Sequence, residues 1–150
     1  MDSFKKLADL NTLLIDDNAV IRNTLTRVYA FYDCPIEAVA TAEEGLRAME
    51  GKYFDVIICD FHLPGINGVE FFRKLTDSHP QAVKVLISGS GNEEAIAGAF
   101  EAGVHEFLKK PFSLATFIER LTPHVDGYLD RSLHHHQPVP RNTFDRCSDS

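Results

Sequence analysis

The sequence predicts an α/β fold in which a doubly wound parallel sheet has five strands in the order 2-1-3-4-5. Two observations support this prediction. Apolar runs of strand length alternate five times with segments of helical periodicity, which is typical of a parallel sheet with helices on both faces. Three of these runs are continuously apolar and two are mixed, and this order places the mixed second and fifth strands at the edges.

The elements can be placed in order along the chain. The strands are expected where the sequence reads TLLID (12–16), PIEAVA (35–40), DVIICD (55–60), KVLIS (84–88) and HEFLK (105–109). After each strand, apolar residues recur at intervals of three and four, which places them on one face of a helix. These helices are expected at 21–32, 42–49, 69–75, 96–103 and 114–121, the third being the least regular.

Residues 11–125 are expected to form one domain, with an N-terminal extension at 1–10 and a disordered tail at 126–150. A length of 150 residues is typical of a single domain. From Asp126 onward the sequence has few apolar residues, two prolines and no periodicity. The three consecutive histidines at 134–136 fall in this tail, and the sequence assigns them no role.

Composition argues against several classes of function. The net charge of −7 disfavours binding to nucleic acid or to an anionic membrane, because phosphates attract basic surfaces. No apolar run approaches the roughly 20 residues of a membrane span, and the N-terminus lacks the apolar core of a signal peptide. The three cysteines show no metal-binding spacing and are expected as reduced thiols. We therefore expect a cytoplasmic protein.

Acidic side chains follow two strands that should be neighbours. Asp16 and Asp17 come at the end of the first predicted strand, and Asp60 ends the third. Ligands of doubly wound folds bind outside the carboxyl ends of the strands, so three carboxylates should converge there. Their mutual repulsion would be offset by a divalent cation, and Mg²⁺ prefers such oxygen ligands, with Mn²⁺ as an alternative.

A hydroxyl and an ammonium group follow the other two strands at the same edge. Ser88 ends the fourth strand, and Lys110 follows the fifth. Beside a cation, these two groups could bind phosphoryl oxygens. The set suits phosphoryl transfer to a carboxylate, giving an aspartyl phosphate, because positioning and charge neutralisation supply most of the catalysis in such reactions.

The motifs IDDN, CDFHLPGING, LISGSG and EFLKKPF, in this order on these strands, resemble the receiver domain of two-component response regulators, which has the flavodoxin/CheY-like fold. The resemblance covers about residues 11–125. It implies that Asp60 is the phosphoacceptor and that Asp16, Asp17 and Asp60 hold Mg²⁺. The main-chain carbonyl of His62, two residues after Asp60, is implied as a further metal ligand.

The resemblance also assigns roles to the later motifs. Ser88 corresponds to the switch hydroxyl and Phe107 to the aromatic residue that changes rotamer with it. The lysine of the family directly precedes a proline, which selects Lys110 over Lys109 and predicts a cis peptide bond at Lys110–Pro111. His62 and Ser90 correspond to the positions that tune the lifetime of the phosphoryl group in the family.

The function implied is that of a signalling phosphoacceptor that catalyses only its own phosphorylation and dephosphorylation. The donor would be a phosphohistidine of a sensor histidine kinase or of a histidine phosphotransfer protein. Residues 126–150 are too few for an output domain, so output is expected through a protein contact or onward phosphoryl transfer. The contact face would consist of 96–103, 105–109 and 114–121. The downstream target of this face is unknown. The sequence also leaves open whether the chain is a fragment of a longer regulator.

Other interpretations of these motifs are weighed against this one. A receiver-like adaptor that is never phosphorylated stays open, and a Mg²⁺-dependent phosphatase of the haloacid-dehalogenase type is disfavoured because it needs D-x-D after the first strand. A flavodoxin-like FMN carrier needs a Ser/Thr/Gly-rich loop where this chain has DDNAV. Asp16 and Asp17 could instead cap a helix. The segment GSGNEE (89–94) has an incomplete dinucleotide motif and is expected as a flexible connection.

Overall fold

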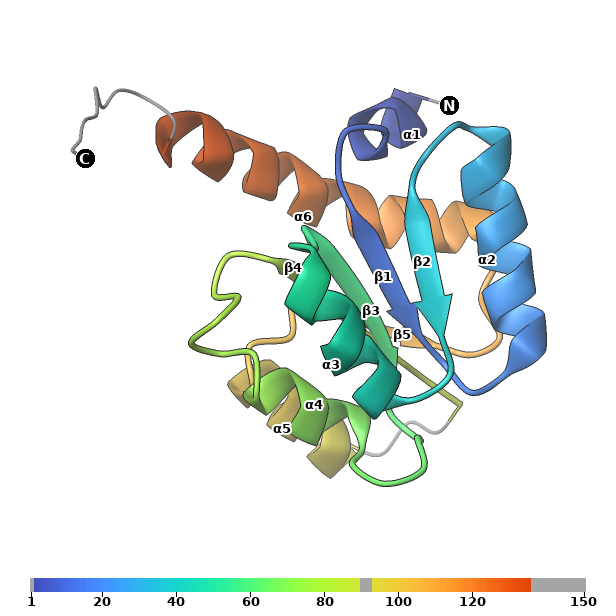
Figure 1. Ribbon diagram of the computed structural model, residues 1–150, viewed down its shortest axis with the longest axis vertical. Helices are drawn as coiled ribbons and strands as arrows, with labels where there is room; N and C mark the ends of the chain where they lie inside the picture. The colour runs from blue at the N-terminus through green and yellow to red at the C-terminus, as the bar shows by residue number, and fades with distance from the viewer. Residues whose placement is uncertain (1, 90–92, 136–150) are drawn as a thin grey trace.

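The computed structural model describes residues 2–89 and 93–135 and contains a five-stranded parallel sheet (Figure 1). The strands lie in the order β2-β1-β3-β4-β5, which confirms the predicted fold class and strand order. In register, Thr12 of β1 lies beside Ile36 of β2 and Val56 of β3. The strands are β1 (Thr12–Ile15), β2 (Ile36–Val39), β3 (Val56–Asp60), β4 (Val83–Ser88) and β5 (Glu106–Lys109).

Helices connect the strands, and an additional helix precedes the first strand. They are α1 (Asp2–Leu7), α2 (Ala19–Phe31), α3 (Ala42–Gly51), α4 (Gly68–Arg73), α5 (Glu93–Glu101) and α6 (Leu114–His135). Because α1 comes first, the helices predicted at 96–103 and 114–121 correspond to α5 and α6. The predicted contact face is therefore the α5–β5–α6 face.

The helices cover both faces of the sheet. Buried side chains of α1, α2 and α6 pack against one face, and those of α3, α4 and α5 pack against the other. Figure 1 shows α3 in front of the sheet and α6 behind it. Successive residues of the central strands alternate between the two cores, as Leu13 and Leu14 do in β1. Each core therefore joins one helical layer to the sheet.

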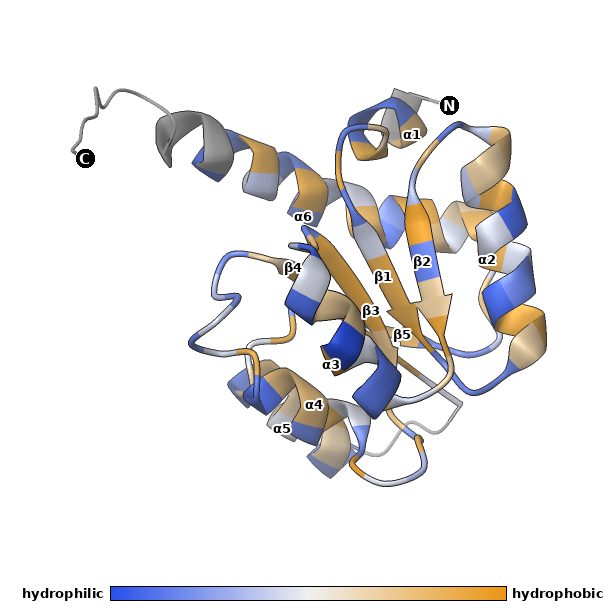
Figure 2. Ribbon diagram, viewed as in Figure 1, coloured by the Kyte–Doolittle hydropathy of each residue, from blue (hydrophilic) through white to orange (hydrophobic). Residues whose placement is uncertain are grey.

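Burial along the strands agrees with their predicted places in the sheet. Every residue of β1, β3 and β4 is buried, whereas β2 is partly buried throughout and β5 has one exposed residue. Figure 2 shows β1 and β3 as largely apolar ribbons beside helices that carry polar residues. A strand covered on both faces needs apolar side chains at every position, which explains the three continuous runs in the sequence.

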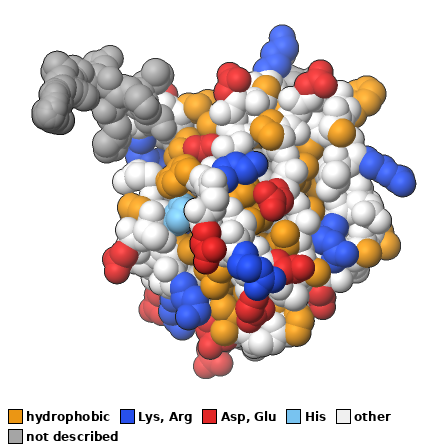
Figure 3. Space-filling model, in the orientation of Figure 1, with side chains coloured by type: hydrophobic (Ala, Val, Ile, Leu, Met, Phe, Trp, Pro, Cys, Tyr) orange, Lys and Arg blue, Asp and Glu red, His pale blue; other side chains and the backbone are white. Residues whose placement is uncertain are grey.

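Within the described residues, no helix is both long enough and apolar enough to cross a membrane. In the face drawn in Figure 3, basic and acidic side chains are interspersed between apolar ones. The charge of this face is thus mixed in sign.

The N-terminal extension predicted at 1–10 contains a helix that the sequence periodicity did not reveal. Phe4 and Leu7 of α1 are each 1% exposed, and Leu10 is also buried. The ring of Phe4 stacks on Tyr32, the C-cap residue of α2, with 4.2 Å between the ring centroids. The extension is therefore packed into the core on the α2–α6 face of the sheet.

The C-terminal tail was predicted to be disordered from Asp126, and this prediction is wrong for residues 126–135. Helix α6 continues through them to His135, while 136–150 lie outside the described residues. Tertiary contacts hold this part of the helix, because Tyr128 is buried in the core, directly after the buried turn at Val125. Asp126 also pairs with Lys6 of α1, with 2.6 Å between Oδ1 and Nζ.

Candidate functional site

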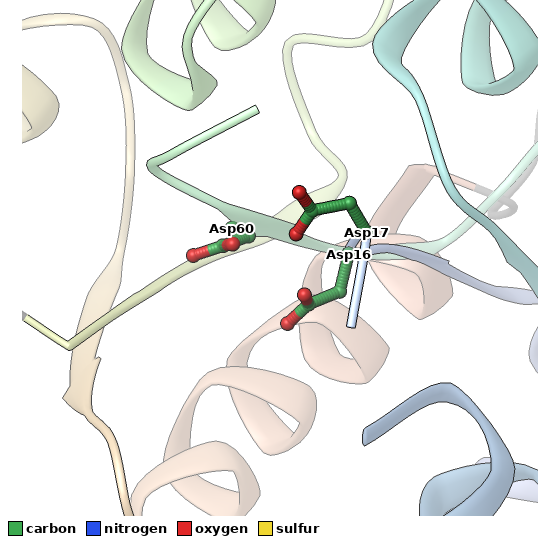
Figure 4. A group of neighbouring side chains, drawn as sticks. All are labelled: Asp16, Asp17 and Asp60. Carbon is green, nitrogen blue, oxygen red and sulfur yellow. The ribbon is translucent and has the colours of Figure 1, made fainter. Parts of the chain in front are cut away.

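Three carboxylates meet at the carboxyl edge of the sheet. Asp16 directly follows β1, Asp17 comes next, and Asp60 is the last residue of β3. The two strands are neighbours, with Ile15 paired to Cys59, so their ends bring these side chains together. One oxygen of each carboxylate lies within 4.8 Å of the other two (Figure 4). Hard oxygen donors at this spacing are the type of group that binds Mg²⁺.

Asp16 is fully buried, and hydrogen bonds and one ion pair hold its side chain and its backbone. Its carboxylate Oδ1 accepts a hydrogen bond from the main-chain N–H of Asn18 at 2.9 Å, and Oδ2 pairs with Lys110 Nζ at 2.9 Å. Its own N–H donates to the carbonyl of Val39 at 3.0 Å. Its carbonyl accepts a hydrogen bond from the Arg22 guanidinium at 2.9 Å. A carboxylate fixed in this way is pre-organised for a ligand.

The N-cap of α2 is Asn18, to which the sequence motifs had assigned no role. Its side-chain oxygen accepts hydrogen bonds from the N–H groups of Val20 and Ile21, at 2.8 and 3.3 Å. Asn18 therefore caps the helix, and the alternative that Asp16 or Asp17 does so is wrong. The signal was present, because Asn directly before a helical pattern is a typical N-cap.

Lys110 lies between two of the carboxylates. Its Nζ is 2.9 Å from Asp16 Oδ2 and 3.4 Å from Asp60 Oδ2. Burial would lower the pKa of Lys110, but the charges and hydrogen bonds of the two carboxylates outweigh this effect and raise it. Its N–H donates to the carbonyl of Ser88 at 2.8 Å, and the bond to Pro111 is cis as expected. The ammonium group is thus held as a cation inside the acidic pocket.

Opposing influences act on the pKa of Asp60. Burial raises the pKa of this carboxyl, and the negative charge of Asp16 raises it further. The ammonium of Lys110 and a hydrogen bond from the main chain of His62 lower it, but the pKa remains above its ordinary value. Any additional cation in the pocket would favour the charged form of Asp60, which is the nucleophilic form.

The remaining predicted site residues lie on β4, β5 and the following loops. Ser88 ends β4 and is buried, with Lys109 as its register partner on β5. The side chain of Lys109 is exposed, whereas Phe107 is half-buried against the core of the α3–α5 face. Ser90 lies outside the described residues. The structure thus places Ser88 at the same edge as Lys110 and sets Phe107 farther back along β5.

Gly68 lets the chain pass close to Asp60. A Cβ atom at this position would come within 2.6 Å of the main-chain oxygen of Asp60, which is too close for any residue with a side chain. The N–H of Gly68 donates to the carbonyl of Phe61 at 3.0 Å, closing the turn after β3. The capping box of Asn67 and Glu70 then begins α4. This packing explains the glycine in CDFHLPGING.

An apolar groove lies beside the acidic pocket. It has a volume of about 410 Å³ and runs between α2 and the segment that joins β5 to α6. Val20 and Ile21 line one side, and Pro111 and Phe112 line the other, next to Lys110. Val20 is 72% exposed. The groove offers an apolar surface directly adjacent to the charged site.

Fold and site together define a doubly wound α/β protein that carries three carboxylates and a lysine at the carboxyl edge of its sheet. A family model described as the response regulator receiver domain matches residues 12–122. The chain therefore belongs to the receiver-domain family of two-component response regulators.

Similar proteins agree with this assignment. The chain is 31% identical over 117 residues to the hydrogenase transcriptional regulatory protein HoxA of Bradyrhizobium diazoefficiens. That match covers 77% of this chain and 24% of HoxA, so the chain spans about a quarter of the relative's length.

Two solved structures illustrate the likeness in fold. A CheY-like receiver domain protein from Methanospirillum hungatei JF-1 has a TM-score of 0.77 and 24% identity, covering 81% of this chain and 98% of that one. The beryllofluoride-activated NtrC4 receiver domain dimer has a TM-score of 0.73 and 26% identity, covering 79% of this chain and 98% of that one.

Proposed function

We propose that this protein is a phosphoacceptor in which Asp60 receives a phosphoryl group from a phosphohistidine. The donor would be a sensor histidine kinase or a histidine phosphotransfer protein. The observation that carries the proposal is the acidic pocket, where three carboxylates lie within 4.8 Å and Lys110 pairs with two of them. Membership of the receiver-domain family supports the same conclusion.

Asp16, Asp17 and Asp60 would hold Mg²⁺ or Mn²⁺, together with the main-chain carbonyl of His62. The donor set fits, because carboxylate and carbonyl oxygens are the preferred ligands of these hard cations. When bound, the cation supplies charge neutralisation to the carboxylates and to the phosphoryl oxygens. The three carboxylates also need such compensation, because Lys110 alone leaves the pKa of Asp60 raised.

The chemistry of the transfer can be assigned to residues of this chain. A carboxylate oxygen of Asp60 forms a bond to phosphorus while the bond between phosphorus and the donor's imidazole nitrogen breaks. Lys110 Nζ, which lies 3.4 Å from the Asp60 carboxylate, would bind one phosphoryl oxygen, and the hydroxyl of Ser88 would bind another. Loss of the group would require attack by water on the same phosphorus, so the residues near it control its lifetime.

The groove beside Lys110 supports docking of the donor on this side of the pocket. A partner that delivers a phosphoryl group must approach Asp60 closely and needs contact surface next to it. The exposed Val20 and the apolar residues Pro111 and Phe112 provide such a surface within the same edge of the molecule. An amphipathic helix of the donor would fit a groove of this kind.

Phosphorylation would act as a switch through charge. It adds about −1.5 to −2 in charge and new acceptor oxygens beside Ser88 and Lys110. Ser88 would move toward the phosphoryl group, and Phe107 would turn inward into the space that it leaves. The α5–β5–α6 face would change shape as the population shifts between two packings, altering its contact with a downstream protein.

The direct test is phosphorylation by a small phosphodonor. Incubation of the protein with Mg²⁺ and acetyl phosphate is expected to add one phosphoryl group, detected by intact-mass spectrometry, and EDTA should prevent the gain. Asp60→Asn should abolish it, because the amide cannot act as the nucleophile.

Each other outcome has a definite meaning. No mass gain under conditions that label a control receiver would favour the adaptor that is never phosphorylated. A gain that survives Asp60→Asn would show that another residue is the nucleophile. Catalytic release of phosphate from varied organic phosphates would instead indicate a phosphatase.

A further inference from the structure

The guanidinium of Arg22 in α2 contacts the chain immediately before Asp17. Its guanidinium donates a hydrogen bond to the carbonyl of Asp16 at 2.9 Å, and its own N–H donates to the carbonyl of Asn18 at 3.2 Å. The Asp16 carbonyl belongs to the peptide plane that joins Asp16 to Asp17. The side chain of Arg22 thus restrains the backbone immediately before the exposed carboxylate of Asp17, whereas the bond of its N–H to Asn18 is the ordinary hydrogen bond of a first helical turn.

We propose that Arg22 is a positioning residue that fixes the Asp16–Asp17 peptide and so aims both carboxylates at one cation. Arg22 itself would not touch the cation. The inference rests on the proposed function, since it concerns how the acidic pair is held for the metal.

The hydrogen bond from Arg22 restrains the backbone at the point where the hydrogen bonds of the sheet end. The N–H of Asp16 still bonds to the carbonyl of Val39 on β2 at 3.0 Å, as a strand residue would. Beyond that bond the chain leaves the sheet, and α2 begins only at Ala19. The peptide after Asp16 therefore lies between two regular elements, and the guanidinium of Arg22 ties it to the first turn of the helix.

Electrostatics makes the restraint necessary. Asp17 follows a buried carboxylate in the chain and lies close to a second one at Asp60, so repulsion favours rotation of its backbone away from the pocket. A hydrogen bond from a charged donor resists that rotation more strongly than a neutral one does. Groups that hold metal ligands in this way strengthen metal binding although they do not touch the metal.

Substitution of Arg22 tests the proposal with a matched control on the same helix. Arg27 is exposed on α2 and carries the same charge, so Arg27→Ala removes the charge without removing the restraint. Titration calorimetry would give the Mg²⁺ dissociation constant of each protein. We expect Arg22→Ala to weaken Mg²⁺ binding on the order of tenfold, the lower end of the range for groups that hold metal ligands. Arg27→Ala should match the wild type within error.

Kinetics and a conservative variant separate positioning from a general loss of structure. With acetyl phosphate as donor, Arg22→Ala should be phosphorylated more slowly at low Mg²⁺ and at the wild-type rate once Mg²⁺ is saturating. Arg22→Lys should recover part of the affinity, because an ammonium can donate one hydrogen bond to the carbonyl. A deficit that persists at saturating Mg²⁺ would overturn the positioning role, as would equal losses in Arg22→Ala and Arg27→Ala.

A second measurement is independent of metal binding. In EDTA, the amide resonance of Asp17 in ¹⁵N-labelled protein should shift and exchange its hydrogen faster in Arg22→Ala than in Arg27→Ala. An unchanged Asp17 amide would refute the restraint itself. If the wild type binds no Mg²⁺ while the Asp17 amide responds as expected, the restraint stands and the proposed metal-dependent function is what fails.

Discussion

Asp60 shows how neighbouring groups set the charge of a single buried side chain. Its carboxyl is 5% exposed, and burial and Asp16 raise its pKa more than Lys110 and the main chain of His62 lower it. A carboxyl with a raised pKa binds a proton more tightly in the folded than in the unfolded protein. Ionised Asp60 therefore destabilises the fold above its folded pKa, and the destabilisation disappears as the pH falls below the unfolded value.

Asp60→Asn is accordingly expected to stabilise the protein at neutral pH. The amide removes the buried charge, so the free energy of unfolding in EDTA should exceed that of the wild type at pH 7. The gain should shrink as the pH falls through the folded pKa, because Asp60 is then protonated in the wild type. Urea unfolding monitored by circular dichroism between pH 4 and 7.5 would measure it.

The outcome that contradicts this prediction is a lower stability of Asp60→Asn at neutral pH. That result would mean that the ion pair with Lys110 stabilises the fold by more than burial and repulsion from Asp16 destabilise it. The exposed control Asp9→Asn should change the free energy of unfolding at pH 7 by less than about 0.5 kcal/mol.

Helix α1 is a short element whose stability comes from packing. Six residues are too few to form a helix in isolation, but Phe4 and Leu7 are almost completely buried against the rest of the molecule. Phe4 stacks on Tyr32 and contacts the ring of Tyr29 edge-on, with 5.8 Å between those centroids. The N-terminal helix thus completes the core that α2 and α6 share with the sheet.

Phe4→Ala is expected to lower the free energy of unfolding by about 3–5 kcal/mol, the usual range when a buried phenylalanine is truncated to alanine. Chemical denaturation would measure this loss. Lys5→Ala, at an exposed position of the same helix, should change stability by less than about 0.5 kcal/mol. A loss below about 1 kcal/mol for Phe4→Ala would show that α1 is not part of the cooperative fold.

Helix α6 shows the same dependence on distant partners. Pro123 lies inside the helix, although proline normally interrupts one by removing a hydrogen-bond donor. Beyond it, the hydroxyl of Tyr128 bonds to Asp55, and Arg131 Nε donates to Gln81 Oε1 at 2.9 Å. These contacts join the second half of α6 to the loops before β3 and β4.

Across the whole molecule, the site and the α5–β5–α6 face are connected through the sheet. Ser88 ends β4 at the acidic pocket, and Phe107 lies on the neighbouring strand β5, beside Leu86 of β4. A movement of Ser88 can therefore be transmitted to Phe107 over one strand. The two-state switch that we propose uses this short path.

Ser88→Ala should separate phosphorylation from the change in the face. Acetyl phosphate with Mg²⁺ is expected to shift the amide resonances of β5, α5 and α6 in the wild type, because the phosphoryl group biases the packing of Phe107. In Ser88→Ala the mass gain should persist, while the amide shifts of β5, α5 and α6 should fall to a minor fraction of their wild-type size. Asp60→Asn, treated in the same way, should show neither effect, and full-size shifts in Ser88→Ala would argue against a switch through this hydroxyl.

Much of the site followed from local patterns in the sequence. The positions of Asp16, Asp60 and Ser88 at strand ends could be predicted because apolar runs mark strands and parallel strands end at one edge of a sheet. The central and edge strands followed from the same runs. The roles of Phe107 and His62 came from the resemblance alone, because nothing in their immediate sequence distinguishes them.

The sequence alone therefore determined the fold class, the strand order and the edge at which the carboxylates gather, since these depend on periodicities within a few residues. Only the tertiary structure decided that α1 is part of the core and that α6 continues to His135, because Lys6 and Asp126 meet across 120 residues of chain. The contact of Arg22 with the Asp16 carbonyl is of the same kind. Contacts between residues far apart in the chain produce no periodic pattern in the sequence, so they can be identified only from the folded structure.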